Sequence, residues 1–500
     1  MTRASLCFRF GGVLIRKMKQ KSLIKLASIA MTALAFVLFT TAALVQERIP
    51  NDPYLYSTGS WGQDYLDQWA HHKIGLLPMG AGKSAWDIET GERNPVVVAF
   101  VDSGIDYLHP EIAKKNIWIN EKEKPGNGID DDKNGFIDDV MGWNFIEENN
   151  TPWDNDGHGT FTAGIVAALS NNGAGIAGIN RGVKIMPLRA LNFAGRGGSS
   201  HIIAAVIYAV NNGARVINIS IEQLETQKSI ALQKVIDYAY KKGVVVVVAS
   251  GNQARDTATI SPSGLNHVIT VAATDTKDKR MGFSNWGKYV RIAAPGEEIL
   301  SLRARRSDFL LMAGSKHYQA GKAFLGSDAQ FYRATGTSFA APFVTGAASL
   351  LLAKNPKLTP EQVERMLLMS ADDVESPGWD QLTGYGRLNA RKALEADPAY
   401  YLYAELHSAG PAKEGNRVVL QAAGTAMGSH WGSYYLEVGQ GDNPTSWRRA
   451  GKLAGGQVQD GTLGALAFQD FGATGKWTVR LVAQDAKGLT RESRVGITLQ

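Results

Sequence analysis

The chain has 500 residues, more than one small domain needs, and its 44% hydrophobic and 20% charged residues exclude global disorder. The formal net charge of +6 is misleading: residues 1–45 hold seven of the 53 basic residues and no acidic one, so the remaining 46 basic and 47 acidic residues give −1. Without a basic excess beyond residue 45, we expect no nucleic-acid partner.

The first 45 residues have the pattern of an export signal. A basic start leads into a mostly apolar run, Leu26–Val45, with the small residues Thr41–Ala43 near its end. This pattern predicts a signal peptide over residues 1–45 and a secreted or extracytoplasmic protein. A run of about 20 apolar residues can also cross a bilayer, so an uncleaved N-terminal membrane anchor is the alternative.

The only cysteine, Cys7, lies inside this segment. Once the segment is removed, the mature chain has no disulfide, no thiol nucleophile and no cysteine-ligated metal. An exported protein without disulfides needs another way to hold its loops together. Bound ions are one candidate.

Short apolar runs alternate with helix-like stretches between residues 96 and 272. The apolar runs are Val96–Val101, Val183–Pro187, Val216–Ile219, Val244–Ala249 and Val268–Ala272, and the helix-like stretches are Gly159–Leu169, Ser200–Asn211 and Lys228–Lys241. Strands alternating with helices of roughly 10–15 residues predict an α/β fold with a doubly wound parallel sheet, covered on both faces. Ligands of such sheets lie at the carboxyl ends of the strands, where Asp102 and Asn252 fall.

The pattern changes from about residue 401. Tyr434–Val438 and Trp477–Val482 alternate between apolar and polar residues, with glycine-rich turns between them and no helical period. This pattern is typical of a small antiparallel all-β sandwich of the immunoglobulin or fibronectin kind. We therefore predict an α/β domain over residues 46–400 and a C-terminal sandwich domain over residues 401–500.

Three separated segments carry residues suited to acyl transfer. Asp102 follows the first apolar run, His158 lies among glycines where a helix begins, and Ser338 opens a helix of small residues. The segments read AFVDSGID, NDGHGTFTAG and GTSFAAPFVTG. Serine becomes a good nucleophile when a base removes its proton, and histidine is such a base near neutral pH. A carboxylate then fixes the histidine tautomer and stabilises the imidazolium.

A fourth segment, ASGN, offers a donor for the negative charge that develops on the substrate oxygen. The amide of Asn252 follows a buried strand, and the N-terminus of the helix at Ser338 aims backbone N–H groups the same way. Each segment alone is weak evidence for catalysis. A lone aspartate after a strand is usually a turn residue, and a lone histidine among glycines is usually structural. Four such residues in the order Asp, His, Asn, Ser on one α/β frame indicate a catalytic site.

Together these segments resemble the catalytic motifs of the subtilisin-like serine proteases, the subtilases, over about residues 50–395. The resemblance implies that Asp102 is the orienting acid, His158 the general base, Ser338 the nucleophile and Asn252 an oxyanion donor. It implies a serine endopeptidase that acts on peptide and protein substrates. The alternative class is a non-catalytic surface or binding protein that uses the protease fold as a scaffold.

The resemblance also implies that two segments border an extended peptide substrate, which would add as a strand between them. The first segment contains Gly195 and Gly197, and the second contains Ser220 and Glu222. Glu222 stands where the family usually has glycine, so it either narrows the first specificity pocket or favours a basic substrate residue. A Glu222 side chain that points into solvent is the alternative.

The stretch GIDDDKNGFIDD near residue 130 has the alternating oxygen ligands of a calcium loop. The candidate ligands are Asp130, Asp132, Asn134 and Asp139. The bidentate acid of an EF-hand is missing, since the twelfth position is Met141. We therefore expect a calcium loop inserted between catalytic motifs, as in some bacterial subtilases, and a solvated acidic loop is the alternative.

A second calcium site follows from the resemblance alone. Subtilases often bind calcium between the N-terminal segment and the loop after the histidine helix. The matching positions are the side chains of Asp52, Glu111 and Asn172 and the carbonyls of Leu169, Ala174 and Ile176. Glu111 stands where aspartate is usual. Calcium is thus the one cofactor that we expect.

Overall fold

The computed structural model describes residues 49–78, 82–221, 228–305, 324–326, 329–415 and 417–499. The predicted signal peptide or anchor, Cys7 and Glu222 lie outside these ranges. Residues Asn51–Gln500 form one compact unit. In the described part of the chain, no helix combines the length and the hydropathy that crossing a bilayer requires.

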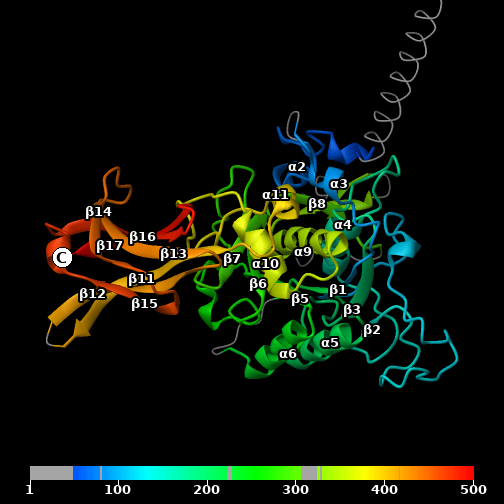
Figure 1. The fold of residues 1–500 in the computed structure, drawn as a ribbon. Helices are drawn as coiled ribbons and strands as arrows, with labels where there is room; N and C mark the ends of the chain where they lie inside the picture. Colours follow the sequence, from blue (N-terminus) through cyan, green and yellow to red (C-terminus); the bar gives the residue numbers. More distant parts are fainter. Residues whose placement is uncertain are drawn as a thin grey trace, which may run out of the picture. The chain divides into compact units, whose positions relative to one another are not determined.

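A parallel sheet of seven strands, in the order β2-β3-β1-β4-β5-β6-β7, forms the centre of this unit (Figure 1). The strands are β1 (Val97–Asp102), β2 (Trp143–Asn144), β3 (Lys184–Arg189), β4 (Val216–Ile219), β5 (Val245–Ala249), β6 (Ile269–Thr274) and β7 (Val290–Pro295). Each apolar run expected from the sequence is one of these strands. The runs are continuous because both faces of the sheet are covered. The predicted α/β class is confirmed.

The described helices are α2 (Trp69–Lys73), α3 (Ala85–Ile88), α4 (His158–Ala167), α5 (Ser199–Asn211), α6 (Ile230–Lys241), α9 (Thr337–Lys354), α10 (Pro360–Met369) and α11 (Ala390–Glu395). Helices α5 and α6 lie on one side of the sheet, and α4 and α9 lie on the other (Figure 1). Sixteen of the 18 residues of α9 are buried, so the serine motif opens a helix that runs through the interior.

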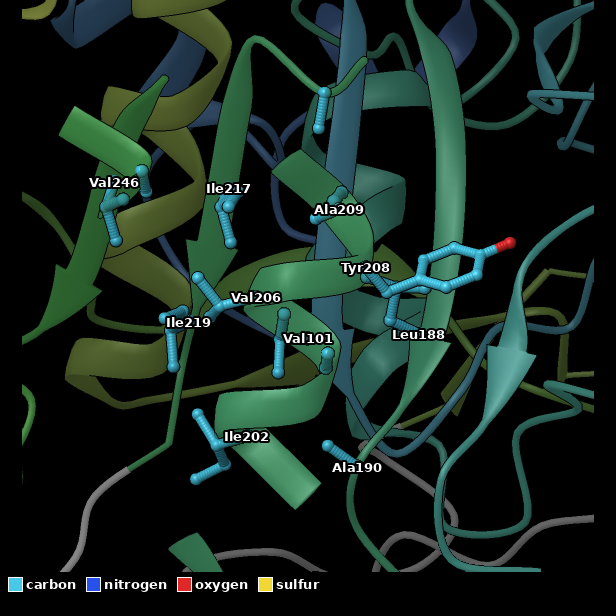
Figure 2. Close-up of a cluster of buried hydrophobic side chains, with 14 of the residues drawn as sticks. Val101, Leu188, Ala190, Ile202, Val206, Tyr208, Ala209, Ile217, Ile219 and Val246 are labelled. Carbon is cyan, nitrogen blue, oxygen red and sulfur yellow. The ribbon is translucent and has the colours of Figure 1, made fainter. Parts of the chain in front are cut away.

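The core between α5 and the sheet explains why α5 forms where the sequence predicts a helix. Ile202, Val206 and Ala209 recur at helical spacing and are fully buried. Figure 2 shows them facing the side chains of the strands, among them Ile217 and Ile219 of β4. This packing holds the ends of β1 and β4 in fixed positions next to each other.

A smaller antiparallel sheet, which the sequence did not predict, lies beside α4. It contains β8 (Ile299–Leu302), β10 (Phe331–Ala334) and β9 (Phe324–Leu325), in that order. The Ser301 hydroxyl of β8 donates to the carbonyl of Phe161 in α4 at 2.7 Å. Ser301 therefore fixes the helix that begins with His158.

The C-terminal residues form two antiparallel sheets. One contains β11 (Leu402–Glu414), β12 (Arg417–Gly428) and β15 (Val458–Leu466), and the other contains β14 (Arg448–Ala454), β13 (Trp431–Gln440), β16 (Gly475–Asp485) and β17 (Thr490–Leu499). One core joins them, with Leu402 and Leu406 from the first sheet and Val479 and Leu481 from the second. This arrangement confirms the predicted all-β C-terminal region, while the boundary at residue 400 stays a prediction.

A half-buried arginine connects the parallel sheet to the C-terminal strands. Arg291 of β7 contacts Glu364 of α10 at 2.8 Å and Glu405 of β11 at 2.9 Å. Glu405 is 5% exposed and also accepts a hydrogen bond from the Tyr385 hydroxyl at 2.7 Å. Burial alone would raise the pKa of Glu405, but the charge of Arg291 and the hydrogen bonds from His407 and Tyr385 together outweigh burial and lower this pKa to about 2. The pair therefore remains charged at neutral pH.

Candidate active site

The topology brings the ends of three neighbouring strands together. Asp102 is the last residue of β1, Ser220 follows β4, and Asn252 lies three residues after β5. Because these strands are parallel and adjacent, their carboxyl ends meet at one edge of the sheet. The loop after β1 also touches the start of α4, since a Cβ on Gly159 would lie 2.0 Å from the carbonyl oxygen of Gly104.

Asp102 and His158 form a direct pair. The Nδ1 atom of His158 lies 2.7 Å from Oδ1 of Asp102, and the Asp102 carboxyl is fully buried. The backbone N–H of Ser103 donates to Oδ1 at 2.8 Å, and the hydroxyl of Thr162 donates to Oδ2 at 3.3 Å. The carboxylate is therefore oriented on both sides, which suits an acid that fixes a histidine tautomer.

The electrostatic surroundings of His158 favour its charged form. Burial alone would lower the pKa of His158, but Asp102, with its charge and hydrogen bond, and then Asp156 and Asp154 outweigh burial and raise it above its usual range. The imidazolium that forms when a histidine accepts a proton is therefore stabilised in this site.

Ser338 is the second residue of α9 and is connected to the strand segment after β4. Its Oγ donates to the carbonyl of Ser220 at 3.2 Å, and the Ser220 hydroxyl donates to the carbonyl of Ser338 at 3.0 Å. Pro342 explains the second bond, because it lacks the N–H that would otherwise bond the carbonyl four residues earlier in the helix. Ser220 supplies the donor that Pro342 cannot.

Asn252 is oriented by the residue before the serine. Its Oδ1 accepts hydrogen bonds from the backbone N–H and the hydroxyl of Thr337, both at 2.9 Å. Because the two ends of an amide group point apart, Nδ2 is on the side away from Thr337. Because Thr337 precedes Ser338, its two hydrogen bonds hold the Asn252 amide in a fixed position relative to the Ser338 backbone.

Helices α4 and α9 meet through aromatic rings next to the reactive residues. The ring of Phe339 lies 5.5 Å from the imidazole of His158 and 4.4 Å from the ring of Phe161, measured between centroids. Phe339 is the neighbour of Ser338 in the chain. The contact therefore places the serine and histidine motifs, 180 residues apart in sequence, side by side.

The segment with Gly195 and Gly197 leaves the same edge of the sheet. The N–H groups of Ala190 and Leu191 both donate to the carbonyl of Asp102, at 2.8 and 3.1 Å. Gly195 has a φ of 65°, and a Cβ on Gly197 would lie 2.0 Å from the carbonyl oxygen of Ala190. Only glycine fits this close turn at residue 197. Ser220 of the second segment is hydrogen-bonded to Ser338.

The carboxyl groups of Asp52 and Glu111 lie close to the loop after α4, as the second predicted calcium site requires. Asp52 is fully buried, its Oδ2 accepts from the N–H of Asn171 at 2.7 Å, and its Oδ1 accepts no hydrogen bond among the described residues. The amide of Asn172 donates to Glu111 at 3.2 Å. Burial, and next the charge of Asp52, raise the pKa of Glu111 to about 7, although the Asn172 bond lowers it.

The backbone residues predicted for this site belong to the same loop. The N–H of Leu169 donates to the Glu111 carbonyl at 2.8 Å, the N–H of Ala174 donates to the side chain of Asn172 at 2.9 Å, and Ile176 is fully buried. An unsatisfied buried carboxylate oxygen beside a second carboxyl group is an unfavourable arrangement without a cation. The residues present therefore fit a calcium ion.

In the acidic loop near residue 130, three carboxylates lie close together, and only two of them are among the predicted ligands. Oxygens of Glu123, Asp130 and Asp132 lie within 4.8 Å of one another. Glu123 was missed in the sequence because it belongs to a run of alternating charges, which usually indicates a solvated surface. Its burial could not be foreseen from that pattern.

The other two predicted loop ligands bond to protein groups. Asn134 donates through its amide to Asp139 at 2.9 Å, and its Oδ1 accepts from the N–H of Phe136 at 2.8 Å. Asp139 also accepts from Asn120 at 3.0 Å and from the hydroxyl of Tyr208 at 2.5 Å. Asp139 therefore attaches the loop to α5, and the three carboxylates of Glu123, Asp130 and Asp132 are the better candidate set.

Known proteins with similar sequences match the part of the chain that contains this site. A profile of the subtilase family matches residues 93–386. Thermitase from Thermoactinomyces vulgaris is 31% identical over 348 residues, which cover 69% of this chain and 99% of thermitase. The cell wall-associated protease of Bacillus subtilis is 34% identical over 364 residues, which cover 67% of this chain and 35% of that protein.

A solved protease structure from Pseudoalteromonas arctica is also similar, with a TM-score of 0.52, 26% identity and coverage of 69% of this chain and 98% of that one. The chain thus spans about a third of the Bacillus subtilis protein and almost the whole length of thermitase. The profile covers more than half of the chain and includes Asp102, His158, Asn252 and Ser338. This chain belongs to the subtilase family.

Proposed function

We propose that the protein is a serine endopeptidase that hydrolyses peptide bonds in proteins, with Asp102, His158 and Ser338 as its catalytic triad. The observation that carries the proposal is the 2.7 Å contact between His158 and the buried Asp102, next to a serine at the N-terminus of a buried helix. Family membership supports the same activity.

The proposed reaction follows the chemistry of these groups. Ser338 Oγ forms a bond to the substrate carbonyl carbon while its proton passes to His158. The Asn252 amide and the Ser338 N–H stabilise the negative oxygen. The C–N bond then breaks as His158 gives the proton to the leaving amine, and a water molecule activated by His158 releases the acyl group from Ser338.

A serine-reactive fluorophosphonate probe tests the assignment and separates an enzyme from a binding protein on the same scaffold. We expect labelling at Ser338 in the wild type and none in Ser338→Ala, with hydrolysis of unfolded protein lost in parallel. Ser429→Ala, which changes an exposed serine between β12 and β13, is the matched control. A wild-type protein that binds peptides but takes up no probe would be a binding protein.

For specificity, we propose that the peptide runs between the Gly195–Gly197 segment and the segment of Ser220 and Glu222. The departure from glycine at residue 222 supports a preference for a basic side chain at that subsite, because a carboxylate attracts a cation. Peptides that differ only in Lys or Leu at the cleaved position provide the test. Equal cleavage rates would show that Glu222 does not select the substrate.

For stability, we propose that calcium binds at two sites, one with Asp52, Glu111 and Asn172 and one with Glu123, Asp130 and Asp132. The buried Asp52 oxygen without a partner supports the first, and the closeness of three carboxylates supports the second. A bound ion would neutralise these charges and fix the loops that carry them. Metal analysis of the purified protein, followed by calorimetric titration after chelation, counts the ions.

For location and organisation, we propose export through a cleaved signal peptide over residues 1–45, followed by a catalytic domain to residue 400 and a C-terminal domain. The basic and apolar pattern of the N-terminal residues and the name of the cell wall-associated relative support export. N-terminal sequencing of the exported protein tests cleavage. Recovery of the full-length chain only in the membrane fraction would favour the anchor.

A further inference from the structure

The turn before α4 contains two aspartates whose charges are compensated to very different degrees. Asp154 accepts five hydrogen bonds, from the hydroxyls of Ser103 and Thr160 and the N–H groups of Asp156, Gly157 and Thr160, at 2.6–3.0 Å. Asp156 accepts one through Oδ1, from the N–H of His158 at 3.1 Å. Its Oδ2 is buried and accepts no hydrogen bond among the described residues.

The position of this uncompensated oxygen restricts what it can do. Asp156 is only 4% exposed, and the buried Oδ2 cannot meet a substrate or water without moving. A carboxylate without local donors acts over a longer range, because its charge is little screened in a dry environment. His158 is the titratable group two residues away, and its N–H holds the other oxygen of the same carboxylate.

The location of His158 creates a need for negative charge. His158 is the first residue of α4, and the positive end of a helix dipole disfavours a cation there. Three carboxylates oppose the dipole: Asp102 from β1, and Asp154 and Asp156 from the turn. Helix α9 contributes the neutral ring of Phe339 on its side of the imidazole. Asp102 contacts the imidazole directly, and the charge of Asp154 is compensated by its five hydrogen-bond donors.

We propose that Asp156 is a positioning residue for the proposed base: its buried carboxylate stabilises the imidazolium that forms when His158 takes the proton of Ser338. The inference rests on the proposed serine endopeptidase activity. It accounts for a buried charge that the triad itself does not need. Burial raises the pKa of Asp156 to about 6, against the lowering effect of His158, so the carboxylate is still ionised at neutral pH.

The first test does not depend on activity. In the Ser338→Ala protein, nitrogen NMR follows the titration of the His158 imidazole with and without Asp156→Asn. The amide keeps an oxygen for the His158 N–H but removes the charge. We expect the pKa of His158 to fall by about one unit, a tenfold change in proton affinity. Asp156→Ser, whose hydroxyl can also accept the N–H, is expected to give the same shift if the asparagine variant folds poorly.

The second test uses the active protein. The acid limb of the kcat/KM profile is expected to move to lower pH in Asp156→Asn, while the rate on the alkaline plateau falls because the imidazolium is less stabilised. Asp442→Asn, which removes an exposed carboxylate between β13 and β14, is expected to leave both unchanged.

Two results would overturn the inference. One is an unshifted His158 titration in both Asp156 variants, which would leave Asp156 with a purely structural role in the turn. The other is a changed preference for basic over neutral peptides with an unmoved acid limb, which would make Asp156 a substrate contact. Failure of the proposed activity gives a different result, namely a wild type that takes up no fluorophosphonate probe. The NMR titration would still show in that case whether Asp156 raises the pKa of His158, because it does not need activity.

Discussion

Two groups of carboxylates outside the catalytic residues accept hydrogen bonds to very different extents. In the acidic loop, the oxygens of Asp130 accept from the N–H groups of Asn134 and Gly135, and those of Glu123 accept from Asp132 and Asp138. At the other site, Asp52 retains a buried oxygen with no donor in the described part of the chain. N–H groups of the loop itself compensate much of the negative charge of its carboxylates, whereas the Asp52 site lacks such a donor for one buried oxygen.

The difference comes from how each site is assembled. The loop closes within about a dozen residues, so its own backbone can supply donors by tight turns. The site of Asp52, Glu111 and Asn172 joins three segments far apart in sequence, so tight turns within one segment cannot supply donors for all of its oxygens. A cation is therefore expected to contribute more to folding at the Asp52 site, where its absence leaves buried charge unopposed.

The largest expected effect is that of calcium removal from the wild type. A ligand present at 1,000 times its dissociation constant stabilises the folded state by about 4 kcal/mol. Because the unfolding entropy of a unit of this size is about 1 kcal/mol per kelvin, excess chelator should lower the melting temperature by about 4 °C for each ion removed. Scanning calorimetry with and without chelator measures the shift, and added calcium should restore it. An unchanged transition would mean that neither group needs an ion.

The second effect separates the two sites. Asp52→Asn is expected to remove most of the chelator response, because the ion at that site has lost its buried carboxylate. Asp130→Asn is expected to remove a smaller part. Both variants are compared with wild type by calorimetry at saturating calcium and after chelation. If Asp130→Asn removes the larger share, the acidic loop is the main stabilising site and our ranking is wrong.

The third effect is a pH dependence of the chelated protein. Burial, with the charge of Asp52, raises the pKa of Glu111 from 4.5 to about 7, so the folded chain retains a proton that the unfolded chain releases. Stability should therefore fall as pH rises from about 4.5 to about 7. Urea unfolding of the chelated protein across this range measures the slope. Glu111→Gln should reduce this slope, and Asp156, whose pKa burial also raises, should keep part of it in the variant.

The smallest effect concerns the attachment of the loop to α5. Tyr208→Phe removes the hydroxyl that donates to Asp139 at 2.5 Å and should cost about 2 kcal/mol, as for other hydrogen bonds to charged groups. Because Asp139 bonds to protein groups in this structure, the cost should be equal with and without calcium. A cost seen only in calcium would make Asp139 part of the ion site.

The parts of the molecule that local patterns determine could be predicted from sequence. Buried parallel strands are continuous apolar runs, so β1, β3, β4, β5 and β6 were found, and the strand order then brings Asp102 and Asn252 to one edge. The alternating C-terminal residues likewise predicted antiparallel sheets. Short strands such as β2 carry too little pattern to be recognised.

The supporting residues of the site could not be predicted, because long-range packing decides their roles. Thr162 reaches Asp102 only because the first turn of α4 packs against Gly104, just after the end of β1. Thr337 orients Asn252 across 85 residues, and Glu123 joins Asp130 and Asp132 only after the chain folds back. Such residue types are common everywhere, and a sequence pattern does not show which copies are buried next to the chemistry.

The ion pair of Arg291 and Glu405 has a consequence for the design of a shorter chain without the C-terminal sheets. A chain ended near residue 400 would leave Arg291 without Glu405 and would expose the surface on which β11 lies. Because Arg291 would keep its ion pair with Glu364, the cost should be smaller than the roughly 3–5 kcal/mol of a buried charge left without any partner. A catalytic domain made without the C-terminal sheets would therefore first need polar replacements for the residues that β11 covers.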